Sequence, residues 1–280
     1  MRMKIWYPDP MRVDCHCHLL PAIDDGARDH AQAMSMVAMA VADGTTDVVC
    51  TPHHLNGVFV NDAPSVKARC RALQQAIDES GLALRLHPGA ENHLVPELPR
   101  ALEDGRALTL ADRGRHVLIE LPALTVPLGT DEMLKVILAQ GLTPIIVHPE
   151  RNNALRRSPE PLKRWVQWGC LGQLTAQSLT GEFGPPVQRV AKAMVAQGVI
   201  HCVASDAHCD RRRPPILSEA HAEIKRWFGA PMASLLADEV PQTLLAGRSV
   251  EARCALAVLA EGHSGRALHN KGPGKPHAAR

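Results

Sequence analysis

The sequence is poor in aromatic side chains and shows neither a charge imbalance nor a long apolar run. With one Tyr, three Phe and four Trp among 280 residues, its core must be filled by aliphatic side chains and Met. The 31 basic and 29 acidic residues nearly balance, which gives no electrostatic argument for a nucleic-acid partner. No apolar stretch reaches the length of a membrane span, so membrane insertion is not expected.

Paired cysteines are missing as well. The eight cysteines have no C-x-x-C spacing and are Cys15, Cys17, Cys50, Cys70, Cys170, Cys202, Cys209 and Cys254. In a chain of this size this pattern is typical of reduced thiols in a cytoplasmic protein rather than of a disulfide framework. Residues 1–10 lack the apolar segment of a signal peptide.

Strands and helices are predicted to alternate about seven times. The strands are expected at residues 13–19, 45–51, 82–87, 116–121, 143–148, 171–175 and 199–204, and the helices at 28–43, 63–80, 95–102, 131–140, 159–168, 185–197, 216–227 and 231–245. Because no linker divides this series, it favours one domain built around a parallel barrel, with an open doubly wound sheet as the alternative. No G-x-G-x-x-G or P-loop motif is present, so nucleotide sites of those kinds are not expected.

The ends of the chain differ in composition from its middle. We expect residues 1–10 to form a short disordered extension and residues 11–260 to form the barrel domain. Residues 261–280 are rich in Gly, Pro, Lys, Arg and His, and are expected to be a disordered basic tail.

Two histidines two residues apart open the most informative stretch. His16 and His18 lie in the first predicted strand, where alternate side chains share a face, so both can reach one metal ion. Cys15 and Cys17 then take the other face, as outward packing residues. The pair Asp24-Asp25 follows the strand, and there Asp25 can bend back over the site. Asp24 either holds a ligand in place or is a turn residue.

Ligand-type side chains also follow almost every later strand. In a parallel barrel the carboxyl ends of the strands converge on one face, where barrel enzymes keep their chemistry. The nine candidate metal ligands are His16, His18, Asp25, His53, Glu91, Glu120, His148, Asp206 and His208. Nine ligands exceed the needs of one ion, which predicts two to three divalent ions, with Glu91 a candidate bridge. Mixed imidazole and carboxylate ligands suit Mn²⁺, Fe²⁺ or Zn²⁺.

Two arginines lie just beyond these ligands. Arg151 follows His148 by three residues, and Arg213 follows His208 by five. The planar guanidinium fork matches phosphate oxygens, so both are candidate phosphate contacts, the alternative being solvated surface charges. A cysteine-based phosphatase site, with Arg six residues after Cys, is not found at Cys17 or Cys202.

These short motifs, taken in order, resemble those of a known group. Asp14-Cys-His-Cys-His18, Thr51-Pro-His53, Gly89-Ala-Glu91, Ile119-Glu-Leu-Pro122, His148-Pro-Glu-Arg151 and Ser205-Asp-Ala-His208 are similar to motifs of the polymerase and histidinol phosphatase (PHP) superfamily. Within that superfamily, the stretch from Gln173 to Gly184 and the sequence Arg213-Pro-Pro resemble the capsular-polysaccharide tyrosine phosphatases of the CpsB/YwqE type.

The resemblance implies an α/β fold, a distorted TIM-like (β/α)7 barrel of the PHP type, and a three-metal site that often holds Mn²⁺. It implies metal-assisted hydrolysis of phosphotyrosine on the tail of a bacterial tyrosine autokinase that controls polysaccharide synthesis. Two alternatives stay open. One is a PHP phosphoesterase acting on a small phosphomonoester or a nucleic-acid end, and the other is a non-catalytic metal-binding adaptor. The oligomeric state is not indicated.

Overall fold

The computed structural model describes residues 12–251, and all its strand pairs are parallel. The strands are β1 (Arg12–Cys17), β2 (Thr45–Cys50), β3 (His53–His54), β4 (Arg85–Pro88), β5 (Glu91–His93), β6 (His116–Glu120), β7 (Thr143–Val147), β8 (Leu171–Thr175) and β9 (Cys202–Ala204). One sheet has the order β1-β2-β4, and the other has the order β3-β5-β6-β7-β8-β9.

The two sheets together form one curled parallel sheet. β2 is followed after two residues by β3, and β4 is followed after two residues by β5, so the chain passes from the first sheet to the second twice. At the opposite edge, the segment after β9 returns to β1: the N–H of Asp206 donates to the carbonyl of His16 (2.8 Å) and the N–H of His18 donates to the carbonyl of Ala207 (2.9 Å). This return places the segment after the last strand directly beside the end of the first strand.

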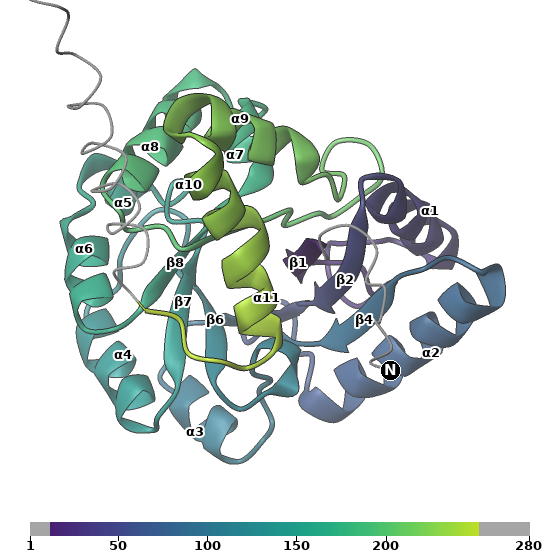
Figure 1. Ribbon diagram of the computed structural model, residues 1–280. Coiled ribbons are helices and arrows are strands. Elements are labelled where there is room, and N and C mark those ends of the chain that lie inside the picture. The colour runs from purple at the N-terminus through teal and green to yellow at the C-terminus, as the bar shows by residue number, and fades with distance from the viewer. Residues whose placement is uncertain (1–11, 252–280) are drawn as a thin grey trace, which may run out of the picture.

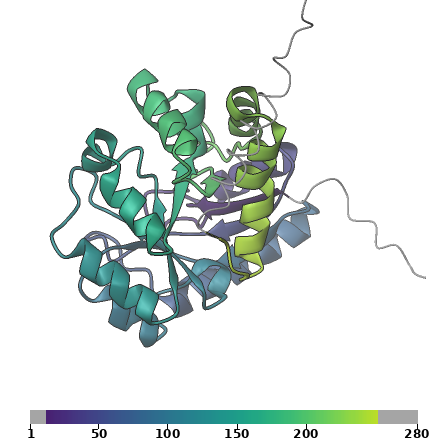
Figure 2. The same ribbon diagram turned by 60° about the vertical axis from the view of Figure 1, so that its left-hand side comes forward.

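Helices surround the curled sheet (Figures 1 and 2). They are α1 (His30–Ala42), α2 (Ala63–Ser80), α3 (Leu98–Glu103), α4 (Thr130–Ala139), α5 (Asn153–Arg157), α6 (Glu160–Gln167), α7 (Ala176–Thr180), α8 (Pro185–Ala196), α9 (Ser218–Phe228), α10 (Ala230–Ser234) and α11 (Val240–Leu245), with a short π-helix at Leu235–Glu239. Within residues 12–251, no helix is both long enough and apolar enough to cross a bilayer.

The last helix closes one end of the sheet. Figure 1 shows α11 lying across the strands, and its Val240 and Leu244 belong to the same buried cluster as Val13, Leu118 and Ile145. The segment leading into β6 reaches the end of α11, where the guanidinium of Arg113 donates to the carbonyl of Leu245 (3.2 Å). The amino-terminal end of the strands is therefore filled with side chains, and the opposite end is left to the loops.

The predicted alternation of strands and helices is largely confirmed, with differences where strands break. His53 and Glu91 lie on short separate strands rather than in loops, and the helices α5 and α7 were not predicted. The expected pairing of the two early cysteines on one outward face is wrong: Cys15 packs with Val49 and Leu118, whereas Cys17 packs with Leu19 in another cluster. The predictions for residues 1–10 and 261–280, and Cys254, lie outside the described residues.

A close backbone contact on β8 gives a first prediction. A Cβ added at Gly172 would lie 2.4 Å from the carbonyl oxygen of Val199. We expect Gly172→Ala to reduce the free energy of unfolding by about 2–3 kcal/mol, the upper part of the range for overpacking. Urea denaturation measures this. Gly44→Ala is the control, because its Cβ would meet open space and only backbone strain is added. Equal losses in both variants would contradict the prediction.

Candidate metal centre

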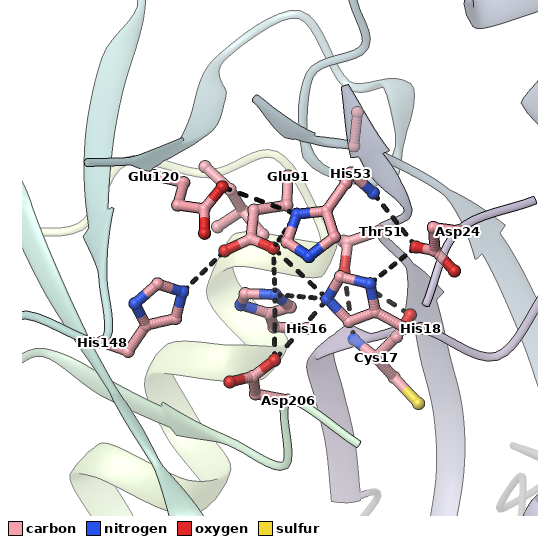
Figure 3. Close-up of polar contacts among 12 residues, drawn as sticks. His16, Cys17, His18, Asp24, Thr51, His53, Glu91, Glu120, His148 and Asp206 are labelled. Carbon is pink, nitrogen blue, oxygen red and sulfur yellow. Dashed lines mark hydrogen bonds and ion pairs between the residues drawn. The ribbon is translucent and has the colours of Figure 1, made fainter. Parts of the chain in front are cut away.

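His16 and His18, at the end of β1, form the base of the site. The pairing of β1 with β2 shifts register between Asp14 and Cys17, and the Nε2 atoms of the two histidines lie only 3.2 Å apart. The Nδ1 atom of each ring forms a hydrogen bond that fixes the orientation of the ring. Gln173 Oε1 lies 2.8 Å from Nδ1 of His16, and Asp24 Oδ2 lies 2.7 Å from Nδ1 of His18. Figure 3 shows both Nε2 atoms turned toward the same group of carboxylates.

The loop after β1 folds tightly back on His18. Asp24 accepts hydrogen bonds from the backbone N–H groups of Gly26 (2.9 Å) and His53 (3.1 Å). A Cβ on Gly26 would lie 2.2 Å from the carbonyl oxygen of His18, so only glycine fits this turn. Asp24 therefore orients His18. Of the two roles expected for Asp24, a turn residue or a residue that holds a ligand in place, the structure supports the second.

Asp25 lies at the mouth of the site. Its side chain is 56% exposed, and its Oδ1 is 3.3 Å from Nε2 of His53 and 3.5 Å from Nε2 of His208. Contacts to these two histidines lower the pKa of Asp25 below its ordinary value, with the His208 contact the larger cause. Asp25 thus closes a group of four ligand-type residues, His18, Asp25, His53 and His208.

Glu91 occupies the centre of the cluster. Its side chain is fully buried, with Oε1 2.7 Å from Nε2 of His148 and Oε2 2.9 Å from Nδ1 of His53. The same Oε2 lies 3.4 Å from Nε2 of His16 and 3.3 Å from Nε2 of His18. Burial alone would raise the pKa of Glu91, but His16 first, and then His148 and His18, hold it well below its ordinary value.

Glu120, at the end of β6, forms the outer wall. Its Oε2 lies 3.5 Å from Nδ1 of His53 and 3.1 Å from Nδ1 of His93. Burial and the neighbouring Glu91 raise its pKa, but the contacts with His53 and His93 outweigh them and lower it to about 2. His93 therefore supports Glu120, whereas the other histidine near a ligand, His54, is buried with no hydrogen bond from either ring nitrogen among the described residues.

Asp206 joins the histidine cluster to the two arginines. Its Oδ1 lies 3.6 Å from Nε2 of His16 and 3.5 Å from Nε2 of His18. Its Oδ2 forms ion pairs with Nη1 of Arg151 (2.9 Å) and Nη2 of Arg213 (2.6 Å), and the same Nη2 donates a hydrogen bond to the backbone carbonyl of Asp206 (2.8 Å). Both arginines therefore lie against the cluster rather than in free solvent. Burial opposes ionisation of Asp206, but the arginines, Arg151 first, lower its pKa well below the ordinary value.

The backbone is strained at two of these residues. His148 has φ +35° and Asp206 has φ +51°, a left-handed region that non-glycine residues rarely occupy. Strained backbone of this kind collects at functional sites, where the surrounding structure holds it. The strain turns both side chains inward from the ends of β7 and β9.

The cluster fits divalent ions by the chemistry of its donors. Three sets of donor atoms lie close enough together to hold an ion each: His18, Asp25, His53 and His208; His16, His18 and Glu91; and His53, Glu91 and Glu120. Within residues 12–251, three buried atoms at the centre make no hydrogen bond, namely Oε2 of Glu91, Oδ1 of Asp206 and Nδ1 of His53. Unsatisfied buried donors and acceptors are costly, and coordination to metal ions would satisfy them.

All nine predicted ligands and both arginines come together at the loop end of the sheet. The sequence analysis missed the residues that hold them: Gln173 behind His16, Thr175, whose hydroxyl lies 3.1 Å from Asp206 Oδ2, and Phe183, whose ring lies against both guanidinium groups. The ring centroid of Phe183 is 5.2 Å from Cζ of Arg151 and 6.0 Å from Cζ of Arg213. Gln173 and Phe183 both lie in the segment from Gln173 to Gly184, which resembles the CpsB/YwqE type. That resemblance was the sequence feature from which these two residues could have been predicted.

The role of Asp24 gives a second prediction. Asp24→Asn keeps the shape of the side chain but weakens its hold on Nδ1 of His18, where burial lowers the pKa and the Asp24 carboxylate raises it to a net value of about 9. We expect metal affinity to fall by about 10- to 100-fold, as for other residues that orient a histidine ligand. Titration with Mn²⁺ followed by calorimetry measures this. Asp62→Asn, on an exposed helix cap, is the control, and unchanged affinity at position 24 would contradict the assignment.

The thiols give a third prediction. Among the cysteines of residues 12–251, six are buried and only Cys209 is partly exposed. Burial raises the pKa of Cys209, but nearby backbone N–H groups lower it below its ordinary value. We nevertheless expect Cys209→Ser to keep the phosphotyrosine hydrolysis implied by the sequence resemblance within about twofold, because such chemistry would belong to the His and carboxylate cluster rather than to a thiol. Loss of turnover in this variant would indicate a thiol mechanism.

Comparison with known proteins agrees with the geometry. The family model described as "Capsular polysaccharide synthesis, CpsB/CapC" matches residues 12–246. Tyrosine-protein phosphatase YwqE of Bacillus subtilis (strain 168) is 34% identical over 226 residues, covering 81% of this chain and 89% of that protein. CpsB of Streptococcus pneumoniae, also named a tyrosine-protein phosphatase, is 26% identical over 238 residues, covering 83% and 98%.

A solved structure shares the fold. It belongs to a study of YwqE from Bacillus subtilis and CpsB from Streptococcus pneumoniae, described as metal-dependent tyrosine phosphatases. It superposes with a TM-score of 0.80 at 33% identity, covering 85% of this chain and 96% of that one. The residues matched by the family model, 12–246, include all nine clustered residues. This chain is therefore a member of the CpsB/CapC family of capsular polysaccharide synthesis proteins.

Proposed function

We propose that this protein is a metal-dependent protein-tyrosine phosphatase. The proposal depends mainly on the position of Asp206. One of its carboxylate oxygens faces the histidine cluster, and the other forms ion pairs with both Arg151 and Arg213. Two guanidinium groups suited to phosphate thus lie directly beside candidate metal ligands, an arrangement that supports phosphomonoester hydrolysis. The names of the relatives, tyrosine-protein phosphatases in Bacillus and Streptococcus, support phosphotyrosine as the substrate.

We assign the nine clustered residues as ligands of two to three divalent ions, most consistent with Mn²⁺, with Fe²⁺ or Zn²⁺ as alternatives. His18, His53 and Glu91 each belong to two of the three donor sets, and Glu91 is the bridging candidate because it is the carboxylate among them, with two oxygens to offer. When bound, the ions supply Lewis-acid activation of water and of the phosphate ester. The ligand types support the choice of these metals, and the description of the related structure as metal-dependent supports the need for a metal.

The protein's own groups position the substrate. Arg151 and Arg213 present guanidinium forks to the phosphoryl oxygens, and the ring of Phe183 holds both forks in place. Binding a phosphate requires the arginines to share or leave Asp206, which frees its Oδ2 for the cluster. Asp24 and Gln173 keep His18 and His16 in one orientation, so the site needs little reorganisation when substrate arrives.

The family match also supports a proposal for the biological setting. We propose that the substrate is the phosphorylated tail of a bacterial tyrosine autokinase in capsular or exopolysaccharide synthesis, and that the protein acts in the cytoplasm. We further propose that the fold is a single-domain, distorted (β/α)7 barrel of the PHP type, in which β2 with β3, and β4 with β5, are two interrupted strands. These assignments rest on the family match over residues 12–246.

A substrate comparison tests the proposal. The Mn²⁺-loaded protein is assayed with a phosphotyrosine peptide, histidinol phosphate and single-stranded DNA. We expect kcat/KM to be highest for the phosphotyrosine peptide. Preference for histidinol phosphate or for DNA would support another PHP phosphoesterase activity instead, and no turnover of any substrate would favour a non-catalytic adaptor.

A further inference from the structure

A concave basic surface lies beside the proposed phosphate site. A cavity of about 470 Å³ between α5 and α8 is lined by Asn153, Arg156, Arg157, Pro186, Arg189, Val190 and Ala193. Three of these seven residues are arginines and none is acidic. We call this surface the arginine groove. Figure 1 shows α5 and α8 as neighbours on the same side of the sheet.

The arginine groove and the phosphate site are built from adjoining segments of the chain. The α5 wall of the groove starts at Asn153, two residues after Arg151. Its α8 wall starts at Pro186, three residues after Phe183. Arg151 and Phe183 are themselves in contact, with Cζ of Arg151 5.2 Å from the ring centroid. Because both surfaces are built from these two adjoining segments, we expect the substrate chain next to a phosphotyrosine held by Arg151 to reach the groove.

The positive charge of the groove is not neutralised by the part of the chain that the structure describes. Within residues 12–251, no carboxylate forms an ion pair with Arg156, Arg157 or Arg189. By contrast, Arg164 on the next helix is paired with Asp131 at 2.9 Å. Arg157 and Arg189 are exposed and Arg156 is half-buried, so all three can reach a ligand.

Helix stability accounts for only part of this pattern. Arg156 and Arg157 lie in the last turn of α5, where a cation interacts favourably with the helix dipole. Arg189 lies in the first half of α8, where a cation gains nothing from the dipole. The convergence of the three side chains on one concavity needs another reason, and an anionic ligand supplies it.

We propose that the arginine groove binds a carboxylate-rich segment next to the phosphotyrosine of the substrate protein. Arg forks recognise carboxylates in bidentate geometry, and a row of them favours an extended acidic segment over an isolated anion. The inference rests on the tyrosine phosphatase function proposed above. It adds a sequence preference to that activity, since acidic residues flanking the tyrosine would raise the affinity for one substrate over another.

The test compares substrates and variants. Three substrates are used: a phosphotyrosine peptide with Glu residues on both sides, the same peptide with Gln in their place, and para-nitrophenyl phosphate. The groove variant is R156A/R157A/R189A. The control variant is R71A/K225A/R248A, which removes the same charge at exposed positions that form no ion pair within the described residues. Values of kcat/KM are measured at low and high salt.

We expect wild type to prefer the Glu peptide by about tenfold, the combined effect of several surface ion pairs, and to lose most of this preference at high salt. The groove variant should hydrolyse both peptides equally and keep wild-type turnover of para-nitrophenyl phosphate. The control variant should keep the preference. A groove variant with the wild-type preference, or a wild type with no preference, would overturn the inference. Wild type that hydrolyses para-nitrophenyl phosphate but neither peptide would instead refute the proposed function.

Discussion

Glu91→Gln is expected to lower kcat by at least about 1,000-fold, a loss of about 4 kcal/mol in transition-state stabilisation. Glu91 is the one carboxylate within reach of four histidines, and its Oε2 makes no hydrogen bond among the described residues. The amide has the same shape but carries no charge, so it cannot hold two ions together. The number of Mn²⁺ ions bound per chain should fall in parallel, as measured by elemental analysis after desalting.

The control for this experiment is Glu103→Gln, which makes the same chemical change on the exposed end of α3. It should leave both activity and metal content unchanged. Circular dichroism checks that Glu91→Gln remains folded, because a buried charge is also part of the packing of the site. A folded Glu91→Gln variant with wild-type turnover would contradict the placement of Glu91 at the centre of the metal site.

Arg151→Ala and Arg213→Ala are each expected to lower kcat/KM for phosphotyrosine by about 100-fold, in the range found when one preorganised charge-stabilising group is removed. Both guanidinium groups are held at Asp206 Oδ2 and against Phe183. Arg151→Lys should recover part of the loss, because it keeps the charge but not the planar fork. Steady-state kinetics on a phosphotyrosine peptide measures these effects.

Metal content separates two roles for these arginines. If they bind substrate, the Ala variants keep their Mn²⁺ ions while activity falls. If the variants lose metal in proportion to activity, the arginines serve to assemble Asp206 rather than to bind phosphate. Arg248→Ala, at an exposed position with no ion pair within residues 12–251, is the matched control and should change neither quantity.

The sequence was sufficient to predict the residues that gather at the site, because ligand-type side chains at the carboxyl ends of parallel strands must meet. It could not predict how they meet. His53 and Glu91 lie on short strands formed only after β2 and β4 break, and such breaks depend on pairing with distant segments. The Cys15 and Cys17 side chains also depart from simple alternation, because the register of β1 shifts between Asp14 and Cys17.

The residues that orient the ligands were harder still to predict. Asp24 could be a turn residue or a partner of His18, and only the fold of the loop over Gly26 decides between them. Gln173 is a neutral polar residue on a buried strand. From the sequence alone it cannot be distinguished from a polar residue that serves only the core. Its contact with His16 spans 157 residues of chain, a distance that no local pattern encodes.

The central claim is that activity depends on two or more divalent ions held by the clustered residues. Its most direct test is a titration of metal-free protein with Mn²⁺, in which bound ions per chain and phosphotyrosine hydrolysis are measured on the same samples. The account predicts negligible turnover without metal and full turnover only at two to three bound ions per chain. Full turnover in the metal-free protein, or saturation at a single ion, would contradict it.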